Sequence, residues 1–279
     1  MSQKWDIEIT PNSKAFDFKL DEVWSYRDLL TLFVRRDFVS HYKQTILGPM
    51  WYFIQPILTT LTFTIIFGNV AKISTNGVPH FAFYMAGITL WQYFADCLNT
   101  TATTFTTNQQ LFGKVYFPRL IVPLSVVTAG LIKLSIQFLL FLLIVGYYFN
   151  KGMIQPNVYA LLTPLLIFML AFTALGGGMI FSSLTTKYRD LVFLLVFGIQ
   201  LFMYATPVIY PSTAIPEKYQ TLAAMNPLSH IIEAFRYGFL GVGNLSFYGL
   251  LYSFCFTIGL FFLGLAIFNK VERSFMDSV

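Results

Sequence analysis

The chain has 279 residues, of which 56% are hydrophobic and 11% are charged, whereas about 25% of residues are charged in an ordinary soluble domain. The apolar residues form long unbroken runs that a globule of this length cannot turn inward, so the composition excludes a water-soluble protein and indicates an integral membrane protein. The formal net charge is +5, but the basic residues flank the apolar runs, which is typical of topology signals and not of a nucleic-acid-binding surface.

The first 48 residues are polar and charged, and they contain no short apolar core followed by a small-residue cleavage site, so we expect no cleavable signal peptide. An amphipathic helix is predicted within them because apolar side chains recur at spacings of three and four residues: Tyr26, Leu29, Leu30, Phe33, Val34 and Phe38. This helix is too charged to cross a membrane. It would lie in the headgroup layer, pack on a partner protein, or do both, until Gly48-Pro49 ends it.

Six stretches are long and apolar enough to cross the hydrocarbon core as helices: 50–70, 81–98, 120–149, 158–184, 191–210 and 245–268. Transmembrane strands would alternate apolar and polar residues, which these runs do not. The fold class is therefore an all-α integral membrane protein with six transmembrane helices. Its predicted parts are an amino-terminal cytoplasmic segment (1–48), a membrane domain (49–270) and a cytoplasmic tail (271–279).

The distribution of Lys and Arg orients the chain. Thirteen of these residues would lie on the side that holds both termini and four on the opposite side, with Lys133 inside a span. By the positive-inside rule, both termini are expected in the cytoplasm.

The segment 211–243 is neither an ordinary loop nor a span. Prolines interrupt it at 211, 216 and 227, and Asn226 and Pro227 suit the cap and first position of a helix. One apolar face follows, with His230, Glu233 and Arg236 elsewhere and the last two at pairing distance. We predict two short re-entrant helices that dip into the outer leaflet. Such backbone needs protein or a water-filled cavity around it, so the segment is a candidate external gate.

Two ionisable residues, Asp96 and Lys133, lie within apolar runs. An ionised side chain at mid-membrane costs about 2.5–3.5 kcal/mol on insertion scales, so both should face the helix bundle or water. Counted from the starts of their spans, they fall at different depths. A direct ion pair is one interpretation, but the difference in depth favours separate partners, which would be helix caps, backbone carbonyls or headgroups.

The sequence gives little support for a metal site or a disulfide bond. Cys97 and Cys255 lie in apolar runs without paired spacing, and His41, His80 and His230 are far apart in the sequence. Paired carboxylates and histidine clusters are also missing from the spans, which disfavours a membrane enzyme such as an acyl or glycosyl transferase. An ion-coupled transporter would normally carry more ionisable groups at mid-membrane than these two.

Five strings occur in order at the predicted membrane boundaries: YKQTILGPMW at 42–51, KVYFPR at 114–119, KYRDL at 187–191, PVIY at 207–210, and 226–236, which begins with NPL and ends at Arg236. Together they resemble the permease subunits of type-2 ABC exporters for O-antigen, teichoic acid and capsular polysaccharides, from about residue 24 to residue 270. An O-antigen permease fits the resemblance best. A type-2 exporter of another substrate, such as teichoic acid, capsule, a drug or a lipid, is the alternative.

The resemblance implies a homodimer in the bacterial cytoplasmic (inner) membrane that exports a lipid-linked polysaccharide. Two separate ATPase subunits would hold ATP and Mg, and this chain would bind no cofactor and act as a permease, not an enzyme. The sequence contains no G-x-x-x-x-G-K-[ST] phosphate-binding motif, which agrees with ATP hydrolysis in a partner chain.

The resemblance also assigns roles to residues of this chain. Those expected to couple to the ATPase are Arg35, Arg36, Asn108, Gln109, Leu111, Phe112 and Lys114. Those expected to line the channel with aromatic faces that suit sugar rings are Trp51, Tyr52, Phe53 and Tyr204. Those expected to form the external gate are Pro207, Tyr210, Asn226, Pro227, Glu233 and Arg236.

Overall fold

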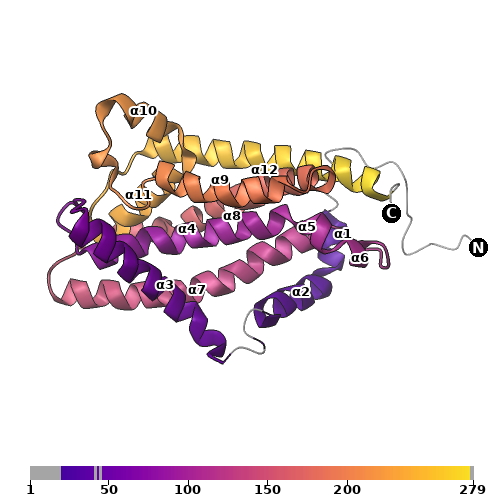
Figure 1. The fold of residues 1–279 in the computed structure, drawn as a ribbon, viewed down its shortest axis with the longest axis horizontal. Coiled ribbons are helices and arrows are strands. Elements are labelled where there is room, and N and C mark those ends of the chain that lie inside the picture. The colour runs from indigo at the N-terminus through magenta and orange to yellow at the C-terminus, as the bar shows by residue number, and fades with distance from the viewer. Residues whose placement is uncertain (1–19, 41–42, 44–45, 277–279) are drawn as a thin grey trace, which may run out of the picture.

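The computed structural model describes residues 20–40, 43 and 46–276, and every regular element in those ranges is a helix (Figure 1). This confirms the predicted all-α class. Part of the predicted amino-terminal segment, the residues Tyr42, Gln44 and Thr45 of the first string, and the end of the predicted tail lie outside the described residues.

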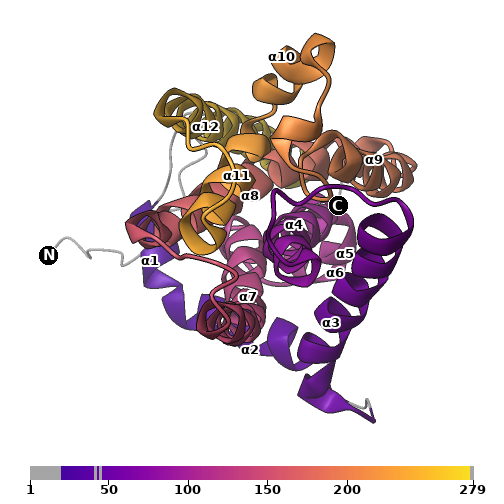
Figure 2. The same ribbon diagram turned by 90° about the vertical axis from the view of Figure 1, so that its left-hand side faces the viewer.

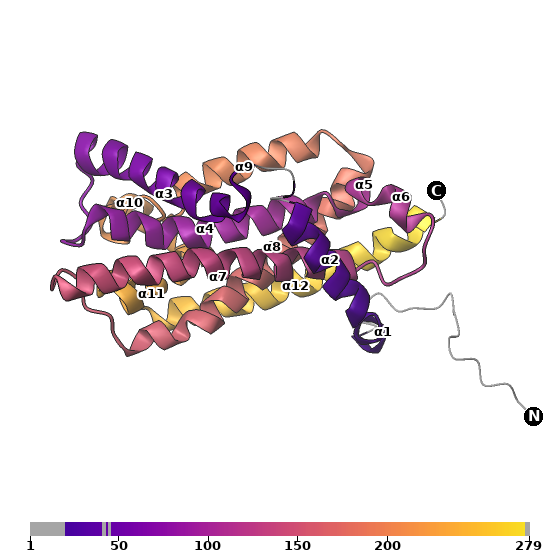
Figure 3. The ribbon, with the colours of Figure 1, turned by 90° about the horizontal axis from the view of Figure 1, so that it is seen from below.

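The longer helices run along the length of the molecule (Figures 1 and 3). They are α3 (Trp51–Phe63), α4 (His80–Ala102), α7 (Ile121–Asn150), α8 (Thr163–Lys187), α9 (Leu191–Ala205) and α12 (Phe247–Met276). A 3-10 turn, η1 (Gly48–Met50), opens α3, and a π-helical stretch, η2 (Thr64–Val70), extends it. Another 3-10 turn, η3 (Val158–Leu162), precedes α8.

Short helices gather at the two ends of the bundle. One end carries α1 (Leu20–Ser25), α2 (Arg27–Ser40), α5 (Thr104–Thr107) and α6 (Gln109–Phe112), and the other carries η4 (Ser212–Ala214), α10 (Glu217–Met225) and α11 (Pro227–Leu240) (Figure 1). The two helices predicted in 211–243 are therefore present. They differ in their surroundings, because 12 of the 14 residues of α11 are buried whereas α10 buries none.

Within the described ranges, four helical segments are both long and apolar enough to cross a membrane: Gly48–Val70, Ile121–Asn150, Val158–Lys187 and Phe247–Glu272. The other two predicted spans differ from these. Helix α9 has 15 residues, or about 22 Å at 1.5 Å per residue, and α4 is long but less apolar.

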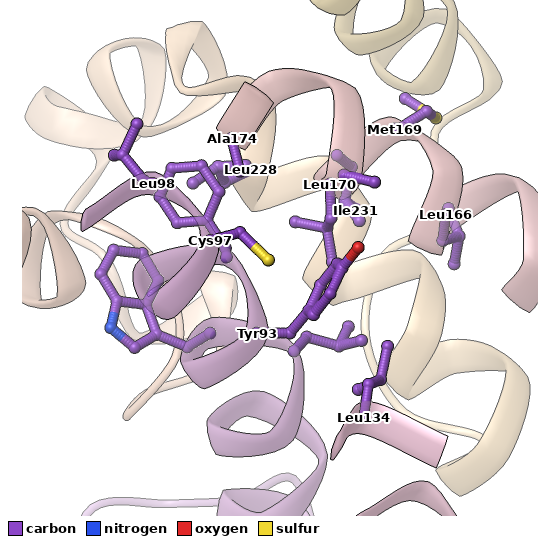
Figure 4. Packing of buried hydrophobic residues seen from close by; sticks show 14 of the residues in the cluster. Tyr93, Cys97, Leu98, Leu134, Leu166, Met169, Leu170, Ala174, Leu228 and Ile231 are labelled. Carbon is purple, nitrogen blue, oxygen red and sulfur yellow. The ribbon is translucent and has the colours of Figure 1, made fainter. Parts of the chain in front are cut away.

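Helix α4 lies in the middle of the bundle, with α3, α7, α8 and α9 around it (Figure 2). Of its 23 residues, 16 are buried. Tyr93, Cys97 and Leu98 of α4 pack against Leu134 of α7 and against a row of apolar residues on α8 (Figure 4). Because protein covers most of its surface, α4 does not need the uniformly apolar sequence of a lipid-facing helix.

Helix α8 approaches α12 closely at Gly176 and α4 closely at Gly178. A Cβ atom added at Gly176 would lie 2.8 Å from the carbonyl oxygen of Leu260, and one added at Gly178 would meet the side chain of Thr101 in α4. Small residues at a helix crossing let the two backbones come together, as in other membrane helix pairs. The glycine run of α8 therefore serves helix packing.

Helices α3 and α9 leave broad apolar faces uncovered. Only Leu195 and Ile199 of α9 are buried, while Phe193, Leu194 and Phe197 are exposed. Water is a poor solvent for surfaces of this kind and extent, so these faces are suited to lipid or to another apolar protein surface.

Candidate functional site

Helix α11 begins at its predicted cap. The side-chain oxygen of Asn226 accepts a hydrogen bond from the backbone N–H of Leu228 at 3.0 Å, and Pro227 occupies the first helical position. The amide nitrogen of Asn226 donates to the hydroxyl of Thr206 at 2.8 Å. The cap therefore also ties the start of α11 to the end of α9.

Arg236 of α11 is completely buried and fixes the segment that follows α9. Its Nη1 donates to the carbonyl oxygen of Pro207 at 2.5 Å, and its Nη2 donates to that of Val208. The guanidinium carbon lies 3.7 Å from the ring centroid of Phe83 on α4, within the range of a cation–π contact. One side chain thus joins α11, the segment after α9, and α4.

Glu233 is also buried, but it takes different partners. Its carboxylate accepts hydrogen bonds from the backbone N–H and hydroxyl of Ser212, at 3.2 and 3.0 Å, and from the backbone N–H of Asn244 at 2.9 Å. The prediction that Glu233 and Arg236 lie outside the buried face and pair with each other is wrong. No ion pair joins them within 4 Å in the described residues, because backbone groups of neighbouring segments occupy both side chains.

Gly87 of α4 provides the space in which Arg236 lies. A Cβ atom at this position would lie 2.6 Å from Nη2 of Arg236 and 2.7 Å from the carbonyl oxygen of Val208. Ordinary contacts between such atoms are about 3.5–4 Å. The sequence carries no signal for this role, since a single glycine in an apolar run has many explanations.

Tyr210, another predicted gate residue, ties the segment after α9 back to the last turn of that helix. Its hydroxyl donates to the backbone carbonyl oxygen of Tyr204 at 2.8 Å. Burial raises the pKa of the Tyr210 phenol, so the group stays protonated and able to donate at neutral pH. Four of the six predicted gate residues cap or lie on α11, namely Asn226, Pro227, Glu233 and Arg236, and Arg236 binds a fifth, Pro207, by a hydrogen bond.

The predicted coupling residues lie at the opposite end of the bundle. Gln109 and Lys114 are exposed, Leu111 is half-buried, and the side-chain amide of Asn108 donates to the carbonyl oxygen of Thr104 at 3.0 Å. A surface for contact with another protein would therefore be formed by exposed positions of the segment 109–116.

Phe112 differs from these neighbours because only 6% of it is exposed. Its ring centroid lies 6.0 Å from that of Phe105 and 5.7 Å from that of Phe117, and the guanidinium carbon of Arg119 lies 5.2 Å from it. Phe112 therefore anchors the segment to the buried core and does not itself present a contact surface.

Contacts distant in sequence connect this segment to both ends of the chain. The ring of Phe33 on α2 contacts that of Phe117 edge-on at 5.7 Å. Arg119 is buried, and its Nη1 donates to the backbone carbonyl oxygen of Glu272 on α12 at 2.9 Å. Burial lowers the pKa of Arg119, and the carboxylate of Glu272 partly offsets this. A displacement of the segment would therefore be transmitted to α2 and α12.

On α2, Arg35 is exposed, and Arg36 is about half exposed and held by its neighbours. The Nε of Arg36 donates to the carboxylate of Asp37 at 2.8 Å, and its guanidinium carbon lies 4.6 Å from the ring centroid of Phe33. The buried side of α2 consists of Phe33 and Val34, as its predicted amphipathic pattern requires.

The four predicted channel residues do not share one orientation. Trp51, Phe53 and Tyr204 are exposed, with Tyr204 at 49%. Tyr52 is 7% exposed; its ring stacks on that of Phe38 at 5.6 Å and its hydroxyl donates to the Phe38 carbonyl oxygen at 3.3 Å. Tyr52 thus holds α2 on α3, and it points away from the exposed aromatic face.

Asp96 of α4 and Lys133 of α7 form a direct ion pair, with Nζ 2.6 Å from the carboxylate oxygen Oδ2. The prediction of separate partners is wrong. Helix α7 has 30 residues, about 45 Å, so its start extends beyond a hydrocarbon core of about 30 Å. A lysine side chain on a helix also points toward the helix amino terminus. Both effects bring the ammonium group to the depth of Asp96.

No group of three or more His, Cys, Asp or Glu side chains that could hold a metal ion is present in the described part of the chain. The described contacts instead anchor the surface segment 109–116 at one end of the long helices and hold the segment after α9 at the other. Sequence reasoning missed Gly87, Thr206 and the partner of Arg119, because each depends on a residue far away in the chain.

Residues 28–240 match the ABC-2 type transporter family. The chain is 32% identical over 253 residues to an O-antigen export system permease protein of Klebsiella pneumoniae, which covers 90% of this chain and 94% of the relative. It is 26% identical over 218 residues to the O-antigen export system permease protein of Myxococcus xanthus, covering 77% of this chain and 81% of that protein. It is 24% identical over 254 residues to the polysialic acid transport protein of Escherichia coli, covering 87% and 93%. The chain therefore belongs to the ABC-2 type transporter family.

Proposed function

We propose that this chain is the permease subunit of an exporter that carries a lipid-linked polysaccharide of the O-antigen type across the bacterial cytoplasmic membrane. The observation that carries the proposal is the similarity to an O-antigen export permease along nine-tenths of the chain. A relative named for polysialic acid transport is similar over nearly the same length but at lower identity. A capsule-like polymer is accordingly the second candidate.

The proposed topology has six spans, α3, α4, α7, α8, α9 and α12, with both termini in the cytoplasm. Four of the described segments are long and apolar enough to cross alone. Helices α4 and α9 would be the other two spans. α4 is supported by its length and by its place among the other spans, and α9 by its apolar sequence. A helix shorter than the hydrocarbon core can be accommodated by local thinning of the membrane.

The proposed assembly is a homodimer with two ATPase subunits, which would hold ATP and Mg. The uncovered apolar faces of α3 and α9 support a second copy of this chain as a neighbour, because Trp51, Phe53 and Tyr204 lie there. Aromatic rings match the apolar faces of sugar rings without fixing any one sugar tightly. A path between two such faces could therefore hold a polymer while it moves.

We propose that the segment 108–119, which we call the coupling segment, passes movement of the ATPase subunits to the helices of this chain. An ATPase would contact its exposed residues Gln109 and Lys114, and Phe112 and Arg119 would transmit the movement to α2 and α12. At the far end, α10 and α11 would form the external gate, in which Arg236 and Glu233 hold the segment after α9.

Deletion of this chain from its host should abolish surface polysaccharide while the lipid-linked polymer accumulates inside the cell. In proteoliposomes with the ATPase, the double variant Gln109→Ala and Lys114→Ala should hydrolyse ATP yet export at least tenfold less polymer. The matched control Lys187→Ala removes an exposed lysine from the end of α8 and should leave export unchanged. Normal surface polysaccharide after deletion would refute the function, and normal export by the double variant would refute the coupling site alone.

A further inference from the structure

A pocket of about 400 Å³ lies between α10 and α11, at the end of the bundle that carries the predicted external gate (Figure 2). Its volume falls in the range of about 300–1,000 Å³ that is usual for ligand-binding sites. One side of α10, one side of α11 and residues of the two neighbouring loops border it. The roles proposed so far leave this pocket without an occupant.

Helix α10 turns one side to the pocket. Gln220, Ala223 and Ala224 form this side, because a spacing of three and four residues places them together on a helix. The ring nitrogen Nε2 of His230 donates to the carbonyl oxygen of Ala224 at 2.9 Å, and the hydroxyl of Tyr252 donates to that of the last residue of α10 at 2.8 Å. Since α10 buries none of its own residues, polar contacts of this kind hold it over the pocket.

Most of the lining residues are polar, and two of them keep free hydrogen-bonding groups. The side-chain nitrogen of Gln220 donates to the carbonyl oxygen of Ile215 at 3.2 Å, and its side-chain oxygen has no partner among the residues that the structure describes. The side-chain amide of Asn244 is exposed and likewise has no partner there, since only the backbone N–H of this residue is used. An amide group both donates and accepts hydrogen bonds, as a hydroxyl group does. Both side chains therefore suit a ligand rich in hydroxyl groups.

The charge of the lining disfavours an acidic ligand. Glu233 borders the pocket, and its carboxylate already accepts hydrogen bonds from Ser212 and Asn244, so it needs no cation from a ligand. Neither Lys nor Arg is found in the described lining. A second carboxylate in the pocket would therefore lie near Glu233 without a positive partner, and like charges placed together oppose binding.

The pocket begins where the proposed path along α9 ends. Pro207 in its wall follows the last residue of α9 by two positions. Tyr204, one of the exposed rings of the path, is tied to the same segment because its carbonyl oxygen accepts the hydroxyl of Tyr210. A polymer that leaves along α9 would meet the pocket next. No Phe, Tyr or Trp lies in the described part of the wall, so the pocket offers hydrogen bonds and not a stacking surface, and it would hold a sugar weakly.

We propose that this pocket binds an uncharged sugar residue of the exported polymer, with Gln220 and Asn244 as hydrogen-bonding side chains, and that Glu233 makes it select against acidic sugars. The inference rests on the proposed function as a polysaccharide exporter. It narrows the cargo to a polymer whose repeating unit contains neutral sugars. A polymer made only of acidic sugars would pass the exit without binding there.

Saturation-transfer NMR of the full-length protein, purified with any subunits that accompany it, tests the proposal. The sample is kept in a detergent without a sugar headgroup, because such a headgroup would compete. The probes are tetrasaccharides of mannose, of N-acetylglucosamine and of sialic acid. We expect at least one neutral probe to bind about tenfold more tightly than the sialic acid probe. Equal binding of all three, or binding of none, would overturn the proposal.

Two substitutions locate the binding. The double variant Gln220→Ala and Asn244→Ala removes exposed amides, so its Tm should stay close to that of the wild type. Its affinity for the neutral probe should fall about tenfold, because two hydrogen bonds to the ligand are lost. The control Asn150→Ala removes an exposed amide that does not border the pocket and should bind as the wild type does. Undiminished binding by the double variant would contradict the assigned site.

A gain of binding tests the charge argument. Ala224→Lys adds a cation at an exposed position of the pocket wall and keeps the backbone carbonyl that His230 contacts. It should raise the affinity for the sialic acid probe about tenfold, and no change would count against selection by charge. If deletion of the chain abolishes surface polysaccharide while no neutral probe binds, the sugar site is refuted and the proposed function stands.

Discussion

Gly87→Ala tests whether Arg236 is packed against α4 as tightly as the structure shows. An alanine in a helix interior normally stabilises a protein by about 0.5–1 kcal/mol relative to glycine. Here the added methyl group would lie 2.6 Å from Nη2 of Arg236 and 2.7 Å from the carbonyl oxygen of Val208. Overpacking of this kind costs about 1–3 kcal/mol. The guanidinium is held by two carbonyl oxygens and cannot move freely, so we expect a net loss of about 1–2 kcal/mol.

The measurement is the apparent Tm of the purified protein at a fixed scan rate, compared with Gly146→Ala on α7. A Cβ atom at Gly146 meets nothing within 4 Å, so this control receives only the helix-propensity gain. A loss of 1–2 kcal/mol corresponds to a Tm lower by about 3–6 °C, on the scale known for domains of 150–250 residues. If Gly87→Ala melts at or above the wild type, as the control should, the tight contact between α4 and Arg236 does not exist.

Two further substitutions examine the ends of the bundle. Phe112→Ala should cost about 3–5 kcal/mol because it empties a buried ring site, lowering the Tm together with export. Lys114→Ala should leave the Tm unchanged, and equal Tm values for the two variants would show that Phe112 is not an anchor. Arg236→Lys should lose at least one of two charge-assisted hydrogen bonds, about 1.5–3 kcal/mol. Faster proteolysis between residues 207 and 216 would report it, and unchanged cleavage would count against the clamp.

The helices were predictable because the apolar runs are long and their ends carry strong local signals. The predicted run 120–149 corresponds to α7 at Ile121–Asn150, and the cap formed by Asn226 is where its sequence indicates. Helix α9 ends at Ala205 and not near residue 210 as expected. Pro207 explains the difference, since a proline disfavours helical backbone at the residue before it and has no N–H to donate.

The partners of the buried charged groups were not predictable in the same way. Sequence spacing places Glu233 and Arg236 on neighbouring turns of one helix, but their partners come from Ser212, Pro207 and Val208, which the chain brings to α11 by folding. Spacing rules cover contacts within a helix. They contain no information on backbone groups that arrive from another segment.

The ion pair of Asp96 and Lys133 was missed for a different reason. Counting depth along each span from its predicted start treats every span as beginning at the membrane surface. Helix α7 is longer than the core that it would cross, so counting from its first residue misplaces Lys133. The length and tilt of a helix relative to its neighbours are set by packing, which one sequence does not reveal.

The central position of α4 has a consequence for biosynthesis. Most of its surface is covered by helices that follow it in the chain, notably α7 and α8, and it carries the ionisable Asp96. A segment emerging from the ribosome partitions into lipid according to its own apolarity, so α4 should enter the bilayer poorly before those helices are synthesised. Nascent chains that stop short of α7 should therefore leave α4 outside the membrane, and lengthening them through α8 should bring it in.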